Sequence, residues 1–147
     1  VGVDYDAEKI ETARHSFLRR PETEFVHADL RTAELPEADA FLLLDVLHYM
    51  QPEEQRGLIA RCAARLKAGG RIIIRDGDAG KAERHKTTAM TEVWSTKIVG
   101  FNKTDGELHF TSTPELQQTA RRLGLEIHAA HTDAHTSNTV YILTRPE

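Results

Sequence analysis

Four short apolar segments, each followed by an aspartate, constrain the fold more than any other feature of this 147-residue sequence. The acids that end the predicted strands are Asp4, Asp29, Asp45 and Asp76. The order strand, helix, strand, strand, helix, strand, with short connections, predicts a parallel sheet with right-handed crossovers. Ligands bind open α/β sheets at the carboxyl ends of the strands, so four acids at that edge predict a binding site.

The spacing of apolar residues places the elements between these acids. Asp6 is expected to cap a helix that runs to about Arg19, with Phe17 and Leu18 on its apolar face. The nearly continuous apolar run at 40–44 predicts a strand that is covered on both faces. Pro52 then begins a second helix, which we expect to reach the glycines that precede the strand at 71–75.

The second half of the sequence continues the pattern with less regular spacing. A third helix is predicted over residues 82–98, and Leu108–Phe110 is a candidate short strand. Thr113 followed by Pro114 predicts the start of another helix, with Thr113 as its cap, and Gly124 is expected to end it. Two closing strands, at 125–130 and 139–144, have no helix between them and are therefore expected to be antiparallel.

The composition is that of one ordinary globular domain, spanning residues 1–147. Hydrophobic residues make up 39% and charged residues 29% of the chain, which argues against disorder. The net charge of -4 gives no electrostatic basis for binding nucleic acid or an anionic membrane. No apolar run reaches membrane-spanning length, so we expect a cytoplasmic protein. The single cysteine, Cys62, is expected to be a buried hydrophobic residue of the second helix.

Four segments around the strand ends form distinct motifs. They are Val1-Gly2-Val3-Asp4, His27-Ala28-Asp29-Leu30, Leu43-Leu44-Asp45-Val46-Leu47-His48-Tyr49 and Leu66-Lys67-Ala68-Gly69-Gly70-Arg71-Ile72-Ile73-Ile74. Together they resemble the class I S-adenosylmethionine-dependent methyltransferases, most closely the small-molecule methyltransferases of bacterial gene clusters. Their order and spacing agree with the family over essentially the whole chain.

The resemblance implies a fold and a cofactor. The fold would be a Rossmann-like three-layer α/β sandwich, mostly parallel, with an antiparallel pair of strands at the C-terminal end. The cofactor would be S-adenosylmethionine. Asp4 would accept hydrogen bonds from both ribose hydroxyls, and Tyr5 would pack on the adenine.

The resemblance also gives roles to the residues after the next two strands. Asp29 would accept from the adenine amino group, and the Leu30 amide would face a ring nitrogen. Asp45 and Val46 would border the methionine part, where a carboxylate suits the positively charged sulfonium.

The family's first strand and its glycine-rich turn have no counterpart in this sequence. That strand lies at the centre of the family's sheet, whose order is 3-2-1-4-5-7-6. Without it, strands two and four of the family would either pair directly or leave two unpaired edges, which proteins avoid. We therefore expect an incomplete domain, completed by about thirty residues of an upstream segment or by dimerisation.

His48 and Tyr49 are the candidate catalytic residues, because they follow the fourth strand of the family, where substrate-facing groups are often placed. A neutral imidazole there could take a proton from an attacking hydroxyl or amine. The alternative is that His48 caps the next segment and Tyr49 packs in the core. Asp76 and Asp78 could bind magnesium, but a solvated loop is the better interpretation. His131, Asp133 and His135 are interpreted as a polar surface loop, so no metal site is predicted.

The leading hypothesis is methyl transfer from S-adenosylmethionine to an oxygen, nitrogen or carbon atom of a small molecule. One alternative is a dinucleotide-binding dehydrogenase, in which an acid after the second strand also binds ribose. The other is a non-catalytic fragment that binds an upstream segment or a partner supplying the missing strand.

Overall fold

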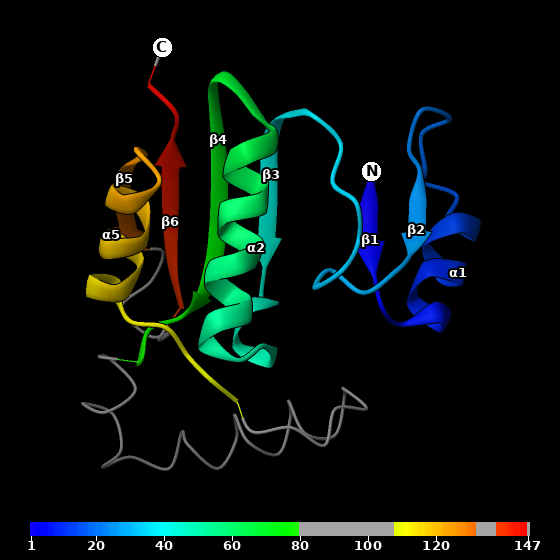
Figure 1. Ribbon diagram of the computed structural model, residues 1–147. Coiled ribbons are helices and arrows are strands. Elements are labelled where there is room, and N and C mark those ends of the chain that lie inside the picture. The colour runs from blue at the N-terminus through cyan, green and yellow to red at the C-terminus, as the bar shows by residue number, and fades with distance from the viewer. Residues whose placement is uncertain (80–107, 132–137, 147) are drawn as a thin grey trace. The chain divides into compact units, whose positions relative to one another are not determined.

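The computed structural model describes residues 1–79, 108–131 and 138–146 (Figure 1). The chain divides into two compact units, Val1–Pro36 and Glu37–Glu147, called here the N-terminal and C-terminal units. The helix predicted over 82–98 lies outside the described residues, as do Asp133 and His135.

The N-terminal unit is a small βαβ arrangement. Strand β1 (Gly2–Asp4) leads into helix α1 (Ala7–His15), and strand β2 (Phe25–His27) pairs with β1 in parallel. The side chain of Asp6 accepts hydrogen bonds from the first-turn amides of the helix, which confirms the predicted cap. Parallel pairing brings the carboxyl ends of both strands to the same edge, with Asp4 opposite His27.

Helix α1 is shorter than the sequence pattern predicted. It ends at His15, because Ser16 adopts an extended conformation with ψ of 128°. The chain therefore leaves the helix before Phe17 and Leu18, which are 93% and 76% exposed instead of buried on the helix face. The apolar residues therefore keep helical spacing beyond His15, although the backbone is no longer helical there.

The C-terminal unit is a four-stranded mixed sheet in the order β3-β4-β6-β5. Strand β3 is parallel to β4, and β6 is antiparallel to both β4 and β5, as predicted for the closing strands. The orders β1-β2 and β3-β4-β6-β5 agree with those that the sequence predicted for strands two to seven of the family. The strands are Ala38–Leu44 (β3), Leu66–Gly77 (β4), Glu126–His131 (β5) and Asn138–Thr144 (β6).

Two helices lie on one face of this sheet (Figure 1). Helix α2 (Pro52–Arg65) follows a short 3-10 helix, η1 (Leu47–Tyr49), and contacts β4, whereas α5 (Thr113–Arg122) contacts β5. Under the helices, alternate residues of β4 and β6 are buried, as the two-residue period of a strand requires. The paired core residues are Ile72 with Leu143 and Ile74 with Tyr141, and the same buried row ends at Asp76 with Thr139.

Two predictions about this sheet were wrong. Strand β3 is not covered on both faces: Leu43 is buried beside Ile74, but Leu42 and Leu44 are 60% and 48% exposed on the other face. Helix α2 also does not reach the glycines. It ends at Arg65, and β4 begins at Leu66 with Gly69 inside the strand at a φ of +67°. That left-handed conformation, which glycine adopts without a steric cost, accommodates the register shift between β3 and β4.

The segment after the undescribed residues 80–107 is irregular. Leu108–Phe110, a candidate strand, pairs with none of the described strands and is held by individual hydrogen bonds. Ser112, not Thr113, caps α5 through a capping box with Glu115, so the predicted helix start was one residue late. Gly124 follows the helix at a φ of +66°, as predicted for its end. No helix among the described residues is long and apolar enough to cross a membrane.

Candidate functional site

All four predicted acids lie at or just beyond the carboxyl ends of strands. Within the N-terminal unit Asp4 ends β1, and Asp29 comes two residues after β2. Within the C-terminal unit Asp45 follows β3 directly, and Asp76 is the last residue but one of β4. Because β3 and β4 are parallel, Asp45 and Asp76 share one sheet edge.

Asp4 and Tyr5 are accessible at the end of β1. Oδ1 of Asp4 accepts the Asp6 amide at 2.9 Å, and within the described residues no hydrogen bond engages its Oδ2. The ring of His27 donates to the carbonyl of Tyr5 at 2.9 Å, which fixes the backbone just after the acid. Tyr5 itself is 45% exposed. The pair therefore presents a carboxylate oxygen and an aromatic face on a braced backbone.

The carboxylate of Asp29 is bound by Arg31, whereas the predicted adenine-binding role requires a carboxylate that can accept from the ligand. Nε and an Nη of Arg31 bind its carboxylate at 2.9 and 2.6 Å, and the Arg31 amide donates to the same group. Both side chains are partly exposed, so the pair contributes little to stability and a ligand could replace it. Leu30 follows in the turn that Asp29 begins.

Asp45 has the only positive φ among the described non-glycine residues, at 53°. Aspartate tolerates this left-handed conformation better than most side chains. Its amide donates to the Arg75 carbonyl at 2.8 Å, and its carboxylate forms an ion pair with the Arg75 side chain. Val46 follows and precedes the first residue of η1. The backbone is thus turned sharply where the predicted methionine-binding residues lie.

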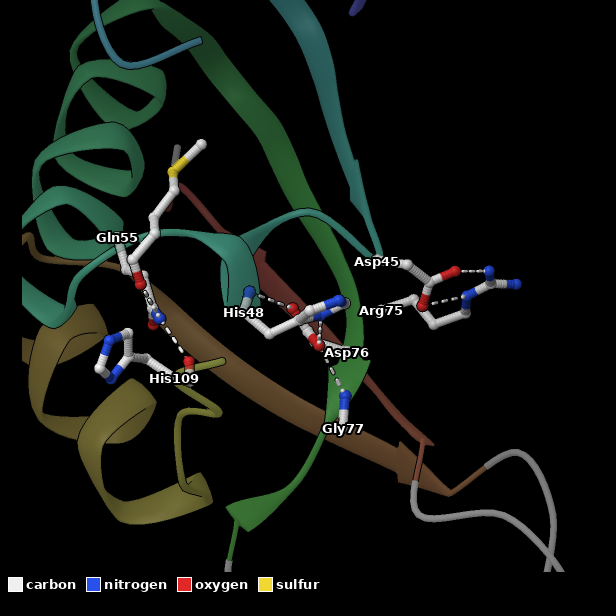
Figure 2. A network of polar contacts seen from close by, with 8 residues as sticks. Asp45, His48, Gln55, Arg75, Asp76, Gly77 and His109 are labelled. Carbon is white, nitrogen blue, oxygen red and sulfur yellow. Dashed lines mark hydrogen bonds and ion pairs between the residues drawn. The ribbon is translucent and has the colours of Figure 1, made fainter. Parts of the chain in front are cut away.

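His48 and Asp76 form a buried pair, shown in Figure 2. Nδ1 of His48 lies 2.6 Å from Oδ1 of Asp76, and the two side chains are 3% and 2% exposed. The carboxylate also accepts the backbone amides of His48 at 3.2 Å and Gly77 at 2.8 Å. Because an ionised carboxylate can only accept, Nδ1 carries the proton and Nε2 of a neutral ring has the lone pair.

Two aromatic rings lie beside the imidazole of His48. Its ring centroid lies 4.1 Å from that of Tyr49 and 5.1 Å from that of Phe110. Nε2 of His48 is buried, and none of the described residues forms a hydrogen bond with it. The sequence left two interpretations of His48, a catalytic base or a cap of the next segment. The geometry does not support a cap, because the imidazole is held by a carboxylate 28 residues away in the chain.

Asp78, interpreted as part of a solvated loop with Asp76, is buried as well. Its Oδ2 accepts the hydroxyl of Thr113 at 2.7 Å and that of Tyr141 at 3.2 Å. Burial, reinforced by the negative charge of Asp78, raises the pKa of Tyr141 above its ordinary value of 10. The solvated-loop prediction was therefore wrong for both acids. The described residues contain no cluster of three or more potential metal ligands.

Cys62 agrees with its prediction as a buried hydrophobic residue of α2. It is 1% exposed, and burial raises the pKa of its thiol to about 11. A thiol that stays protonated is a poor nucleophile, so this cysteine belongs to the core.

Comparison with known proteins decides the family. The family model of the O-methyltransferase domain matches residues 3–110, which is more than half of the chain. The chain belongs to the O-methyltransferase family. Among curated protein sequences, none matches it significantly.

Solved structures agree with this family assignment. An O-methyltransferase family protein from Burkholderia thailandensis is 28% identical, with a TM-score of 0.63 over 84% of this chain. Human N-acetylserotonin methyltransferase, solved in complex with SAM, is 19% identical, with a TM-score of 0.69 over 96% of the chain. The chain spans 36% and 39% of the lengths of these two proteins.

A third structure shows the same fold at lower identity. The N-methyltransferase NodS from Bradyrhizobium japonicum, solved in complex with S-adenosyl-L-homocysteine, is 14% identical, with a TM-score of 0.66. It covers 99% of this chain, which spans 65% of NodS. The Rossmann-like methyltransferase fold predicted from the four motifs is thereby confirmed for this O-methyltransferase domain.

The sequence predicted the acids and His48, but it missed the pairing of His48 with Asp76 and the contributions of Phe110 and Gln55. It treated Asp76 as a strand end and did not pair it with His48, although the alternation of Ile72 and Ile74 already puts Asp76 on the core face. Phe110 and Gln55, which approach the same site, have no local signal, because only the folded chain brings them to η1.

Proposed function

We propose that this domain transfers a methyl group from S-adenosylmethionine to a hydroxyl group of a small molecule, with His48 as the general base. The observation that carries the proposal is the buried His48–Asp76 pair, in which the carboxylate accepts from Nδ1 and no described residue bonds to Nε2. A hydroxyl acceptor loses a proton when it is methylated, so a positioned base is of use there. The family assignment supports oxygen as the methylated atom.

The side chains of the N-terminal unit fit an adenosine group. Asp4 presents a carboxylate oxygen not engaged by the described residues, which suits the two ribose hydroxyls. Tyr5 offers an exposed ring for the adenine. Asp29 and Leu30 would bind the adenine edge once Arg31 releases the carboxylate, a release that costs about 1 kcal/mol or less for an exposed pair.

In the C-terminal unit, Asp45 and Val46 would border the methionine part of the cofactor, and Tyr49 would help to enclose the acceptor. The bound cofactor supplies an activated methyl group on a positively charged sulfonium. Asp76 fixes the imidazole with its Nδ1 protonated, as the carboxylate of a catalytic triad does. Nε2 then accepts the proton of the attacking hydroxyl, and Asp76 stabilises the imidazolium that forms.

The test separates cofactor binding from base catalysis. We expect S-adenosylhomocysteine to bind the chain in calorimetric titration, and Asp4→Ala to weaken binding about tenfold, roughly the value of one hydrogen bond to a charged group. Asp39→Ala is the matched control, because that carboxylate is 83% exposed and pairs only with Lys67 among the described residues. His48→Gln should keep the affinity and slow methyl transfer about a hundredfold or more.

Equal affinity of Asp4→Ala and the wild type would contradict the ribose role. Turnover that survives His48→Gln would contradict the base, because orientation alone would then account for the rate. The dehydrogenase alternative predicts binding of a nicotinamide dinucleotide instead, and the family match favours methyl transfer over it.

The exposed face of β3 favours a second candidate function. In it, the chain is non-catalytic until it pairs with another protein segment. Leu42 and Leu44 are exposed on this strand, and β4 is its only neighbour in the sheet that the described residues form. Light scattering after gel filtration tests it: a stable dimer supports pairing with a second copy, and a monomer that binds S-adenosylhomocysteine contradicts the need for a partner.

A further inference from the structure

We propose that Phe110 is a positioning residue for His48: it packs on the imidazole and keeps Nδ1 directed at Asp76. The proposal rests on the function proposed above, in which Nε2 must be the atom presented to the acceptor. Neither sequence reasoning nor the family assignment gives Phe110 a role. Its support comes from the contacts that it makes with His48 and Gly77, and from the bonds of its neighbour His109. Figure 2 labels these three residues.

The first contact is between the two rings. Phe110 and His48 are stacked, with centroids 5.1 Å apart and planes 26° apart. Tyr49 adds a tilted contact at 4.1 Å and 49°. A flat imidazole against a flat ring can rotate about its χ2 axis only if the neighbour moves, because protein interiors are close-packed. Stacking therefore opposes the half-turn that would exchange Nδ1 for a carbon atom opposite Asp76.

The second contact explains how Phe110 comes so close. A Cβ atom placed on Gly77 would lie 2.9 Å from Cδ1 and Cε1 of Phe110, nearer than such atoms approach in proteins. Only glycine at this position lets the ring lie against the backbone. The amide of Gly77 is the group that donates to Oδ1 of Asp76 at 2.8 Å. Phe110 thus packs against the imidazole of His48 and against the backbone of Gly77, whose amide binds the Asp76 carboxylate.

The third set of contacts ties the backbone beside Phe110 to the loop that carries His48. The amide of His109 donates to the His48 carbonyl at 2.9 Å. The His109 carbonyl accepts from Nε2 of Gln55 at 2.6 Å, and the same amide group donates to the Met50 carbonyl at 3.0 Å. Gln55 is 5% exposed, so these bonds are shielded from water. One glutamine of α2 therefore holds residue 109 against η1.

The segment is also anchored beyond Phe110. The carbonyl of Thr111 accepts the Ala79 amide at 3.1 Å. Two residues further, the hydroxyl of Thr113 donates to Asp78 at 2.7 Å. Because both flanks are bonded to η1, to α2 or to the two residues that follow β4, Phe110 has little freedom to leave the imidazole. This arrangement gives a role to a segment that does not pair with any described strand.

The experiment is nitrogen-15 NMR of the histidine rings in the intact chain. We expect His48 to be the Nδ1–H tautomer, with a slowly exchanging Nδ1 proton that is visible in one-bond correlation spectra. Phe110→Leu should remove that signal through exchange broadening, whereas Phe110→Tyr, which keeps the ring, should restore it. Phe17→Leu is the matched control, because the Phe17 side chain is 93% exposed and should leave the signal unchanged.

A persistent Nδ1 proton in a folded Phe110→Leu variant would overturn the proposal. If that variant does not fold, Gly77→Ala decides, because its new methyl group displaces the Phe110 ring and should also remove the signal. An Nε2–H tautomer in the wild type would overturn the proposal without any variant. Failure of the proposed function is separate, since it would appear as absent binding of S-adenosylhomocysteine while the His48 signal behaves as described.

Discussion

The aspartates that follow strands fall into two groups with opposite surroundings. Asp29 and Asp45 are partly exposed, and each forms an ion pair with a nearby arginine. Asp76 and Asp78, at the end of β4, are buried and bind a histidine ring, hydroxyls and backbone amides. The same local pattern, an acid after an apolar strand, thus produces two kinds of carboxylate.

The difference teaches that the strand end fixes only the edge at which an acid lies, and not its depth. Asp76 continues the buried row of Ile72 and Ile74 under α2 and α5, so tertiary cover makes it a core residue. Arg75, one residue earlier, faces the other side of the sheet and reaches Asp45. Adjacent residues of one strand therefore serve a buried pair and an exposed one.

The largest expected effect is from Asp76→Ala. Removing the carboxylate leaves two backbone amides and a ring nitrogen without their acceptor in a buried site, which should lower the free energy of unfolding by about 3 kcal/mol. Urea denaturation measures the change. Asp29→Ala is the control from the exposed group and should change stability by about 0.5 kcal/mol or less. Similar losses for both variants would erase the distinction between the groups.

A smaller effect is expected from Tyr141→Phe, which removes a hydroxyl that bonds to Asp78 and Thr113. The loss should be about 1 kcal/mol at neutral pH. Because burial raises the Tyr141 pKa, the folded chain holds this proton more tightly than the unfolded chain does. Its contribution is complete below pH 10 and is lost as pH rises through the folded pKa, so the two proteins should converge at high pH. Denaturation across an alkaline pH series checks this, and a gap that widens with pH would contradict it.

The smallest effect is expected from Asp45→Asn. Asparagine keeps the tolerance for a positive φ and removes only the charge of an exposed ion pair, so stability should change by about 0.5 kcal/mol or less. Asp45→Ala, which also adds backbone strain, should cost about 1 kcal/mol more. Thermal denaturation of the two variants sharpens the comparison. An Asp45→Asn loss as large as that of Asp76→Ala would place Asp45 in the buried group.

Local sequence patterns predicted the elements well where the signal was stereochemical. The Asp6 cap, Pro52 near the start of α2 and Gly124 after α5 depend on the chemistry of a few neighbouring residues. The misses came where burial had to be inferred from hydrophobicity. Phe17 and Leu18 are apolar at helical spacing yet exposed, because the backbone left the helix at Ser16.

By itself the sequence determined the order of strands and helices and the acids at the carboxyl ends of the strands, because periodicity and turn chemistry act over a few residues. The resemblance of its four motifs indicated the family. Only the tertiary structure decided which acids are buried and that His48 is held by Asp76 and packed on by Phe110. These residues are separated by 28 positions or more in the chain. Their meeting depends on strand register and on the helices that cover the sheet, neither of which a local pattern encodes.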